Sequence, residues 1–238
     1  MVAKAEHVKV DTGTTAGEAR HAVTRDRLRD GSFLAALRAA APAGAVFRSD
    51  AELSSSLAET LVGRDPAEDV WVFGYGSLMW NPALNYVESC RADLRGWCRR
   101  FCIRTYAGRG APETPGLMLA LDRGGTCRGI AFRIATADVE EELALLWRRE
   151  MLAGSYRPRW VRAEIRGAPV KALTFVVNRQ SERYACGLSP TRTAELIAAG
   201  KGTLGTCSAY FETTLDTLSA LGIDDVGLQR IRDVLAAT

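Results

Sequence analysis

A glycine-rich loop is the first part of the sequence whose residues could do chemistry. Residues 73–80 read FGYGSLMW and follow a short apolar stretch. Glycine lets a ligand approach the main chain, and successive backbone N–H groups in such a turn can converge on an anion. The pattern favours a binding place for a carboxylate or phosphate, with an ordinary tight turn as the alternative. It is neither a Walker loop nor a Gly-x-Ser-x-Gly nucleophile elbow.

Glu150 is the main candidate for a catalytic acid or base. Val139, Leu143, Leu146 and Glu150 recur at helical spacing, so they share one face of a helix expected at 138–151. Partial burial raises the pKa of a carboxyl group and suits it to proton transfer. The alternative is a glutamate at the helix end that turns outward to a nearby arginine.

Three further side chains could line a pocket. Tyr156 follows the expected helix, Tyr210 lies near the start of a later helix, and Arg109 stands beside Gly110 in a loop. A tyrosine combines an apolar body with a polar tip, which suits a binding cavity. The alternatives are core aromatics with hydroxyls at the surface and, for Arg109, a plain turn.

The number and positions of the histidines and cysteines limit the possible catalytic mechanisms. The chain has two histidines, His7 and His21, and six cysteines without a CxxC pair. A Ser-His-Asp triad, a Cys-His pair or a histidine-ligated zinc site is therefore not expected in residues 22–238. The cysteines are too sparse for a disulfide scaffold. We expect a site of carboxylates, tyrosines, lysines, arginines, cysteines or backbone groups, with no metal.

The composition is that of a globular protein. Hydrophobic residues make up 47% of the chain and charged residues 25%, close to the usual shares. No apolar run approaches the ~18 residues of a membrane-spanning helix. The first thirty residues include acids such as Glu6 and Asp11 and have no apolar core, which is unlike a secretory signal. We expect a cytoplasmic protein with reduced thiols and no membrane partner.

The amino-acid composition of the chain changes near residue 70. Of its 18 aromatic residues, 16 lie in 70–238, and a core needs such large side chains. We predict an N-terminal extension at 1–69, mobile over 1–20 with a short helix at 32–41, and one domain at 70–238. The domain holds 22 basic and 17 acidic residues, an excess too small to favour a nucleic-acid partner. We expect most of the extension to be dispensable for chemistry.

Within the domain, strands come mostly in series and helices follow, which favours an α+β fold. Asp138 and Glu141 form a possible capping box for the 138–151 helix. The expected strands are 70–73, 96–104, 117–121 and 129–134, the last two separated by a turn at Gly124-Gly125, and a hairpin of 161–165 and 172–177 that turns at 167–169. The expected later helices begin after Ser189 and end at Gly200, then cover 206–221 and 225–236.

Four segments together resemble the ChaC family of γ-glutamylcyclotransferases. They are VWVFGYGSLMW at 70–80, RGAPE at 109–113, the Arg149-Glu150 pair at a helix end, and GLSP at 187–190. The resemblance continues to Leu221-Gly222, covers nearly all of 70–238 and includes none of 1–69. The loop followed by an Arg-Glu pair is fairly specific, although neither half is specific alone.

The resemblance implies a small mixed β-barrel flanked by helices, and cofactor-free cleavage of glutathione to 5-oxoproline and cysteinyl-glycine. It implies that the Tyr75–Leu78 loop holds the γ-glutamyl group and that Glu150 is the acid/base. Because the substrate amine is tethered to the carbonyl that it attacks, proximity supplies much of the rate and no enzyme nucleophile is required. The expected substrate-binding residues are Tyr75, Gly76, Ser77, Leu78, Arg109, Tyr156 and Tyr210.

Three positions depart from the family pattern. Gly108 stands where a histidine commonly precedes the Arg-Gly pair, and Cys207 and Ala209 replace an asparagine and an acid in residues 205–210. These changes bear on substrate preference more than on reaction type. Two alternatives therefore stay open: a cyclotransferase for other γ-glutamyl amines, and a non-catalytic regulator that binds a γ-glutamyl group or another anion.

Overall fold

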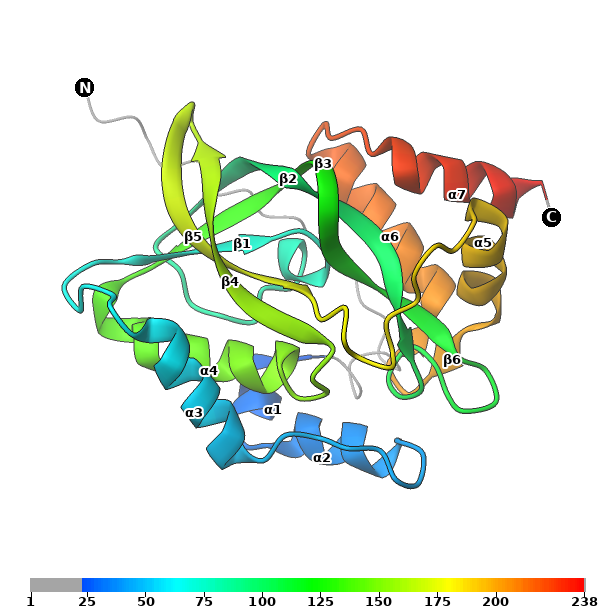
Figure 1. Cartoon of the computed structure of the whole chain (residues 1–238), viewed down its shortest axis with the longest axis horizontal. Helices are drawn as coiled ribbons and strands as arrows, with labels where there is room; N and C mark the ends of the chain where they lie inside the picture. The colour runs from blue at the N-terminus through cyan, green and yellow to red at the C-terminus, as the bar shows by residue number, and fades with distance from the viewer. Residues whose placement is uncertain (1–22, 238) are drawn as a thin grey trace.

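The computed structural model describes residues 23–237 (Figure 1). The expectation that residues 1–20 are mobile lies outside this range. Within it, a barrel of β-strands stands at the centre of the molecule. One group of helices from the C-terminal part packs on one side, and helices from the N-terminal part pack on the other (Figure 1).

Five strands close the barrel in the order β1-β3-β2-β4-β5. The pairs β1–β3, β2–β3, β2–β4 and β4–β5 are antiparallel, whereas β1–β5 and β3–β5 are parallel. The α+β fold with a small mixed barrel is therefore confirmed. The strands are β1 (Val70–Gly74), β2 (Glu88–Thr105), β3 (Gly116–Ile134), β4 (Tyr156–Ile165) and β5 (Ala168–Val177).

The expected turn at Gly124-Gly125 is wrong, because β3 continues through it. Arg95 pairs with Thr126 and Trp97 with Arg123, so one residue of β2 faces two glycines of β3. This is a β-bulge, in which an extra residue bends a strand without ending it. Both glycines have positive φ, 112° and 66°, which is why the pattern resembles a turn. The bulge lets two long strands curve around the barrel.

The hairpin of β4 and β5 has a tighter turn than expected. Arg166 and Gly167 have φ of 52° and 79°, and β5 already begins at Ala168. Two consecutive residues with positive φ form the turn whose twist matches that of the flanking strands. The turn is therefore at 166–167 rather than 167–169.

The predicted helices of the domain are present. They are α4 (Val139–Glu150), α5 (Pro190–Ala199), α6 (Cys207–Ala220) and α7 (Val226–Ala236). Short elements are the 3₁₀ helices η1 (Ser77–Met79) and η2 (Thr136–Asp138) and the strands β6 (Lys201–Gly202) and β7 (Gly205–Thr206). The expected capping box of α4 is wrong. The Asp138 side chain accepts no hydrogen bond from the first turn of α4. Glu141 instead pairs with Arg25 and Arg29 of the extension.

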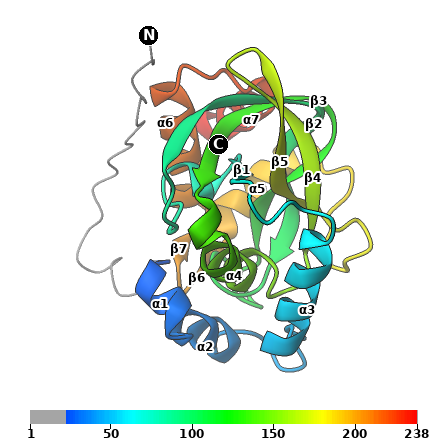
Figure 2. The ribbon, with the colours of Figure 1, turned by 90° about the vertical axis from the view of Figure 1, so that its left-hand side faces the viewer.

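The extension contributes three helices, α1 (Arg25–Arg29), α2 (Ser32–Ala39) and α3 (Asp50–Leu61). The sequence predicted only α2. Figure 2 shows α1, α2 and α3 beside α4. Leu53 of α3 is buried within the main core, and Trp160 of β4 donates from its indole to the carbonyl of Thr60 at 2.8 Å. The helices are therefore built into the fold.

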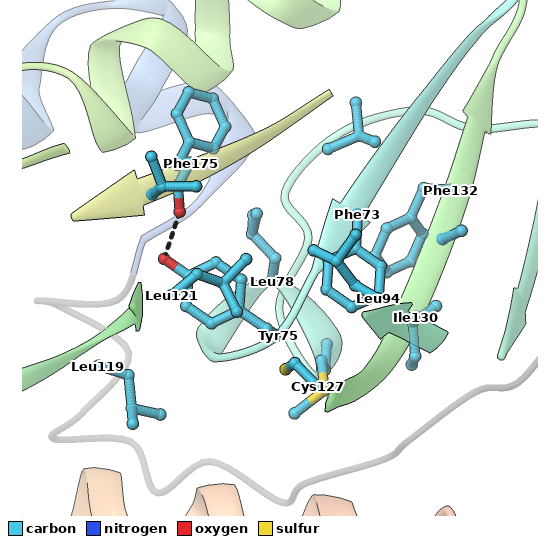
Figure 3. Packing of buried hydrophobic residues seen from close by; sticks show 14 of the residues in the cluster. Phe73, Tyr75, Leu78, Leu94, Leu119, Leu121, Cys127, Ile130, Phe132 and Phe175 are labelled. Carbon is cyan, nitrogen blue, oxygen red and sulfur yellow. Dashed lines mark hydrogen bonds between the residues drawn. The ribbon is translucent and has the colours of Figure 1, made fainter. Parts of the chain in front are cut away.

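The core fills the barrel with apolar side chains from its strands (Figure 3). Phe73, Leu94, Ile130 and Phe132 are each at most 2% exposed. Burying one such side chain stabilises the fold by about 1.5–3 kcal/mol. In the described part of the chain, no helix is long and apolar enough to cross a membrane.

Candidate active site

One cavity of about 740 Å³ collects every predicted site residue. Sites for small molecules measure about 300–1,000 Å³, so the space suits a ligand the size of a short peptide. The cavity is lined by Tyr75, Gly76, Ser77, Leu78, Arg109, Glu150, Tyr156 and Tyr210, among others. Segments that are far apart in the sequence thus meet at one place.

The glycine-rich loop leaves the end of β1 and turns at once into η1. A Cβ on Gly74 would lie 2.9 Å from the Cβ of Leu78, and one on Gly76 would lie 3.1 Å from the Tyr210 hydroxyl. Both glycines are therefore needed for close packing. The first N–H groups of a helical turn have no acceptor inside it, so Ser77 and Leu78 have main-chain donors that η1 does not use.

Tyr75 anchors the loop to the barrel. Its hydroxyl donates to the carbonyl of Phe175 on β5 at 2.8 Å (Figure 3), and burial raises the pKa of this phenol well above its ordinary value. Its own carbonyl accepts a 2.5 Å hydrogen bond from Arg99, a buried cation that also pairs with Asp225 at 2.6 Å. The ring and the main chain of Tyr75 are thus both held in place.

Glu150 is the last residue of α4, and its carboxylate is nearly buried. Its side chain is 14% exposed, and that of Arg149 is 5% exposed. The Arg149 guanidinium contacts a Glu150 carboxylate oxygen at 3.0 Å and donates to the Ser77 hydroxyl at 2.9 Å. It also donates to the carbonyl of Asn81 at 2.6 Å. The alternative of a surface glutamate therefore does not describe Glu150.

Burial and the partner's charge have opposite effects on the pKa values of Glu150 and Arg149. Burial raises the pKa of Glu150, while the neighbouring Arg149 cation lowers it, and burial is the larger effect. Burial likewise lowers the pKa of Arg149, and the Glu150 carboxylate opposes that change. A carboxyl group with a raised pKa accepts and returns a proton more readily near neutral pH than an ordinary glutamate does.

Tyr156 and Tyr210 place hydroxyl groups in the same cavity. The Tyr156 hydroxyl donates to the carbonyl of Leu119 at 2.7 Å, while Tyr210 presents its hydroxyl toward Gly76. Burial raises the pKa of both phenols, so each stays protonated; the Tyr156 proton is used on Leu119, while the Tyr210 hydroxyl can donate to a ligand. Arg109 lies over the Tyr210 ring, with its guanidinium carbon 5.7 Å from the ring centre.

The sequence did not reveal two parts of this cavity. Arg149 was seen only as a neighbour of Glu150, although its contacts join Glu150 to the loop; a long-range contact of this kind leaves no local signal. The second part is the extension, which contributes Phe33, Leu37 and Phe47 to the cavity wall. Phe33 and Leu37 lie in the helix expected at 32–41, but nothing in that segment predicted a role in a site for them.

The extension is tied to both sides of the Arg149–Glu150 pair. The amide of Asn81 donates to the carbonyl of Val23 at 2.8 Å, and Asn81 is itself held by Arg149. On the other side, the N–H of Arg48 donates to the carbonyl of Leu152 at 2.9 Å. The extension therefore contacts both Asn81, whose carbonyl accepts from Arg149, and the chain just after Glu150.

The departures from the family pattern have structural reasons. Gly108 has a φ of 81°, and a Cβ there would meet a Leu204 methyl carbon at 3.2 Å, so a histidine would be both strained and crowded. The Cys207 thiol is buried and donates to the carbonyl of Leu117 at 3.0 Å. Ala209 lies in the cavity wall, where a small side chain leaves more room than an acid would.

The remaining candidates for chemistry are groups of metal-ligating side chains and the cysteines. Among residues 23–237, no three His, Cys, Asp or Glu side chains come together in such a group. The six cysteines are all unpaired, and burial raises the pKa of Cys102 to about 12 and that of Cys127 to about 11. These two thiols stay protonated at neutral pH, which makes them poor nucleophiles.

The structure is a mixed β-barrel in which a glycine-rich loop and a buried glutamate line one cavity. This places the protein in the class of barrel proteins that bind a small molecule. Residues 70–237 match the family model described as ChaC-like protein, and the chain belongs to that family. It is 45% identical over 176 residues to the glutathione-specific γ-glutamylcyclotransferase of Escherichia coli, covering 74% of this chain and 76% of that protein.

Two further comparisons agree. The zebrafish (Danio rerio) glutathione-specific γ-glutamylcyclotransferase 1 is 33% identical over 176 residues, covering 71% of this chain and 90% of that protein. The crystal structure of a yeast γ-glutamylcyclotransferase specific to glutathione superposes with a TM-score of 0.63 at 17% identity. It covers 71% of this chain and 98% of the yeast chain, which supports the fold.

Proposed function

We propose that this protein is a glutathione-specific γ-glutamylcyclotransferase that releases 5-oxoproline and cysteinyl-glycine. The observation that carries the proposal is the meeting of the Glu150 carboxylate and the loop at Tyr75–Leu78 in one cavity. The names of the Escherichia coli and zebrafish relatives support the same activity and the same substrate.

The reaction needs little from the protein beyond position and proton transfer. The α-amine of the γ-glutamyl group attacks its own γ-carbonyl carbon and closes a five-membered ring. Because both reacting groups belong to one molecule, holding them in the reactive conformation supplies much of the rate. The protein must also fix the α-carboxylate, remove a proton from the ammonium group and return one to the leaving nitrogen.

Glu150 is proposed to carry that proton. As a carboxylate it takes a proton from the α-ammonium group, and the neutral amine then forms the new C–N bond. The tetrahedral intermediate collapses as the old C–N bond breaks and Glu150 gives the proton to the departing nitrogen. The ring nitrogen loses its second proton, which also passes to the departing amine, so the products are 5-oxoproline with a neutral ring amide and cysteinyl-glycine with an ammonium group. Glu150 ends as a carboxylate, so it is ready for another cycle. Arg149 keeps the carboxylate aimed into the cavity through its 3.0 Å contact.

The loop is proposed to hold the γ-glutamyl end of the substrate. The main-chain N–H groups of Gly76, Ser77 and Leu78 are the donors for the α-carboxylate, in the manner of other backbone anion sites. The Tyr210 hydroxyl, which burial keeps protonated, is a further donor, whereas the Tyr156 hydroxyl gives its proton to the Leu119 carbonyl and can accept a hydrogen bond from the substrate. Charge that develops on the γ-carbonyl oxygen is stabilised by such preorganised donors.

The same assay separates this function from both alternatives. Purified protein is incubated with glutathione, γ-glutamyl amino acids and γ-glutamyl-lysine, and 5-oxoproline is measured. Turnover of glutathione in preference to the others supports the proposal. Preference for γ-glutamyl-lysine indicates a cyclotransferase for other γ-glutamyl amines, and binding without 5-oxoproline indicates a non-catalytic regulator. We further propose a cytoplasmic location and no nucleic-acid partner, in keeping with the mild positive charge.

A further inference from the structure

Two arginines face each other across a short strand pairing at one end of the cavity. Ile103 of β2 and Tyr184 form an isolated antiparallel bridge, which places Arg104 directly opposite Arg183. The Arg104 N–H donates to the Arg183 carbonyl at 2.8 Å. Residues opposite each other in an antiparallel pair project to the same side, with Cβ atoms about 4.5–5.5 Å apart. Both residues line the cavity.

This arrangement leaves two like charges together without an acid. Neither Arg104 nor Arg183 forms an ion pair with a residue in 23–237. The nearby Asp122 is already bonded to Arg179 and to the Tyr184 hydroxyl. Like charges at opposite positions destabilise a sheet, and burial lowers the pKa of Arg183. An anion in the cavity would offset both effects.

The pair lines the same cavity as Glu150 and the glycine-rich loop. Ile103, next to Arg104, belongs to an apolar cluster against which Tyr156 and Met118 pack. Tyr156 and Met118 are both part of the cavity wall. In glutathione, two residues follow the amide that is cleaved, and they span about 7 Å when extended. Their terminal carboxylate can therefore extend beyond Tyr156 toward the arginines.

We propose that Arg104 and Arg183 form a subsite for the carboxylate at the end of the leaving group. Guanidinium groups bind carboxylates through strong paired hydrogen bonds. The subsite would select γ-glutamyl peptides with a free terminal carboxylate over γ-glutamyl amines, which lack one. This inference rests on the proposed function and adds the feature by which the leaving group is recognised.

Binding is measured first, in protein carrying Glu150→Gln so that the ligand is not consumed. Calorimetry compares glutathione with its glycinamide form, in which the terminal carboxylate is a neutral amide. We expect glutathione to bind at least about tenfold more tightly, the change that follows the loss of a hydrogen bond between charged groups. Equal dissociation constants for the two ligands would overturn the proposal.

The arginines are then replaced. Adding Arg104→Gln and Arg183→Gln should weaken glutathione binding, leave the glycinamide almost unaffected, and so remove the preference. The matched control is Arg123→Gln with Arg162→Gln, which replaces two exposed arginines outside the cavity. The control protein should keep the preference for glutathione over the glycinamide. Retention of the preference in the arginine-pair variant would contradict the assignment, even if that variant is less stable.

A failure of the proposed function can be distinguished from a failure of the subsite proposal. In the protein with Glu150 and both arginines intact, 5-oxoproline formation from glutathione tests the activity itself. The same protein should show a KM for the glycinamide at least about tenfold above that for glutathione, with kcat changed much less, because the subsite acts in binding. If no 5-oxoproline forms, the binding comparison still decides whether the carboxylate subsite exists.

Discussion

Arg149 and Ser77 are joined by a 2.9 Å hydrogen bond across 72 positions of the sequence. The same guanidinium contacts Glu150 at 3.0 Å, so one buried cation links the loop to the carboxylate. The Arg149 side chain thus connects these two parts directly. A displacement of either part would break a charged hydrogen bond in a buried place, which costs about 1–3 kcal/mol or more.

Replacing Glu150 by glutamine tests its proposed role. The amide fills the same space but cannot act as the base, so kcat should fall by at least ~10²-fold, the usual effect of removing a general acid or base. Glutathione binding should persist. Glu140→Gln is the matched control, because Glu140 is exposed on the same helix. A Glu150→Gln protein that keeps most of its turnover would rule out the assignment.

The dependence of activity on pH should reveal the environment of Glu150. Burial raises the pKa of Glu150, and the base form is needed, so activity should decline with falling pH earlier than for an ordinary glutamate. Arg149 lowers this pKa. Arg149→Gln should therefore move the acidic limb of the kcat/KM profile to higher pH.

Arg148→Gln is the control for that profile. Arg148 lies on the same helix but donates to the carbonyls of Leu28 and Arg29. It should leave the acidic limb in place while removing the same charge. An unmoved limb in the Arg149 variant would show that another group controls the profile.

Two substitutions in the loop separate main-chain from side-chain roles. Gly76→Val places atoms against the Tyr210 hydroxyl, which would be 3.1 Å from the new Cβ, and should abolish substrate binding. Ser77→Ala keeps the N–H and loses the hydrogen bond from Arg149, so activity should fall by less than about tenfold. KM and kcat of both proteins check this order, with thermal unfolding as the test of folding.

A buried ion pair between the extension and α4 should matter for stability. Glu142 is 1% exposed and pairs with Arg25, whereas Arg29 pairs with Glu141, which is 54% exposed. Removing one partner of a buried pair costs about 3–5 kcal/mol, while an exposed pair contributes about 0–1 kcal/mol. In urea unfolding, Arg25→Gln should therefore be clearly less stable than the control Arg29→Gln. Equal losses would contradict this difference.

Truncation tests the extension as a whole. A protein that begins at residue 65 loses Leu53 from the core and the apolar cavity wall of Phe33, Leu37 and Phe47. The packing predicts lower stability and weaker activity, the opposite of the sequence-based expectation that most of residues 1–69 are dispensable. A protein beginning at residue 23 keeps every contact described here and is the control. Full activity of the shorter protein would support the earlier expectation.

Sequence patterns predicted the elements whose signals are local. Helical spacing gave α4 and placed Glu150 on its inward face, and Ser189 and Gly200 bounded α5. Other features needed the tertiary structure. The glycines at 124 and 125 form a bulge rather than a turn because β2 continues to pair beside them. That partner strand is not visible from the glycine pair alone.

The extension shows a second kind of limit. Ser49 and Glu52 form a capping box for α3; this signal is present in the sequence and could have identified the helix, which was not predicted. Its packing was harder to foresee, because few large side chains mark the segment. Arg25 and Glu142 are separated by 117 positions, and their partnership follows from the fold alone.

The order in which the chain is synthesised gives the extension an unusual position. Its partners on α4 and β4 lie 100 to 120 residues later in the sequence, which takes roughly 5–20 s to translate. During that interval α1, α2 and α3 lack the surfaces of α4 and β4 that they cover in the folded protein. Closing such long loops slows folding. Helices α1, α2 and α3 are therefore made before their partners on α4 and β4, and the part of the cavity wall that they supply can be completed only once those partners exist.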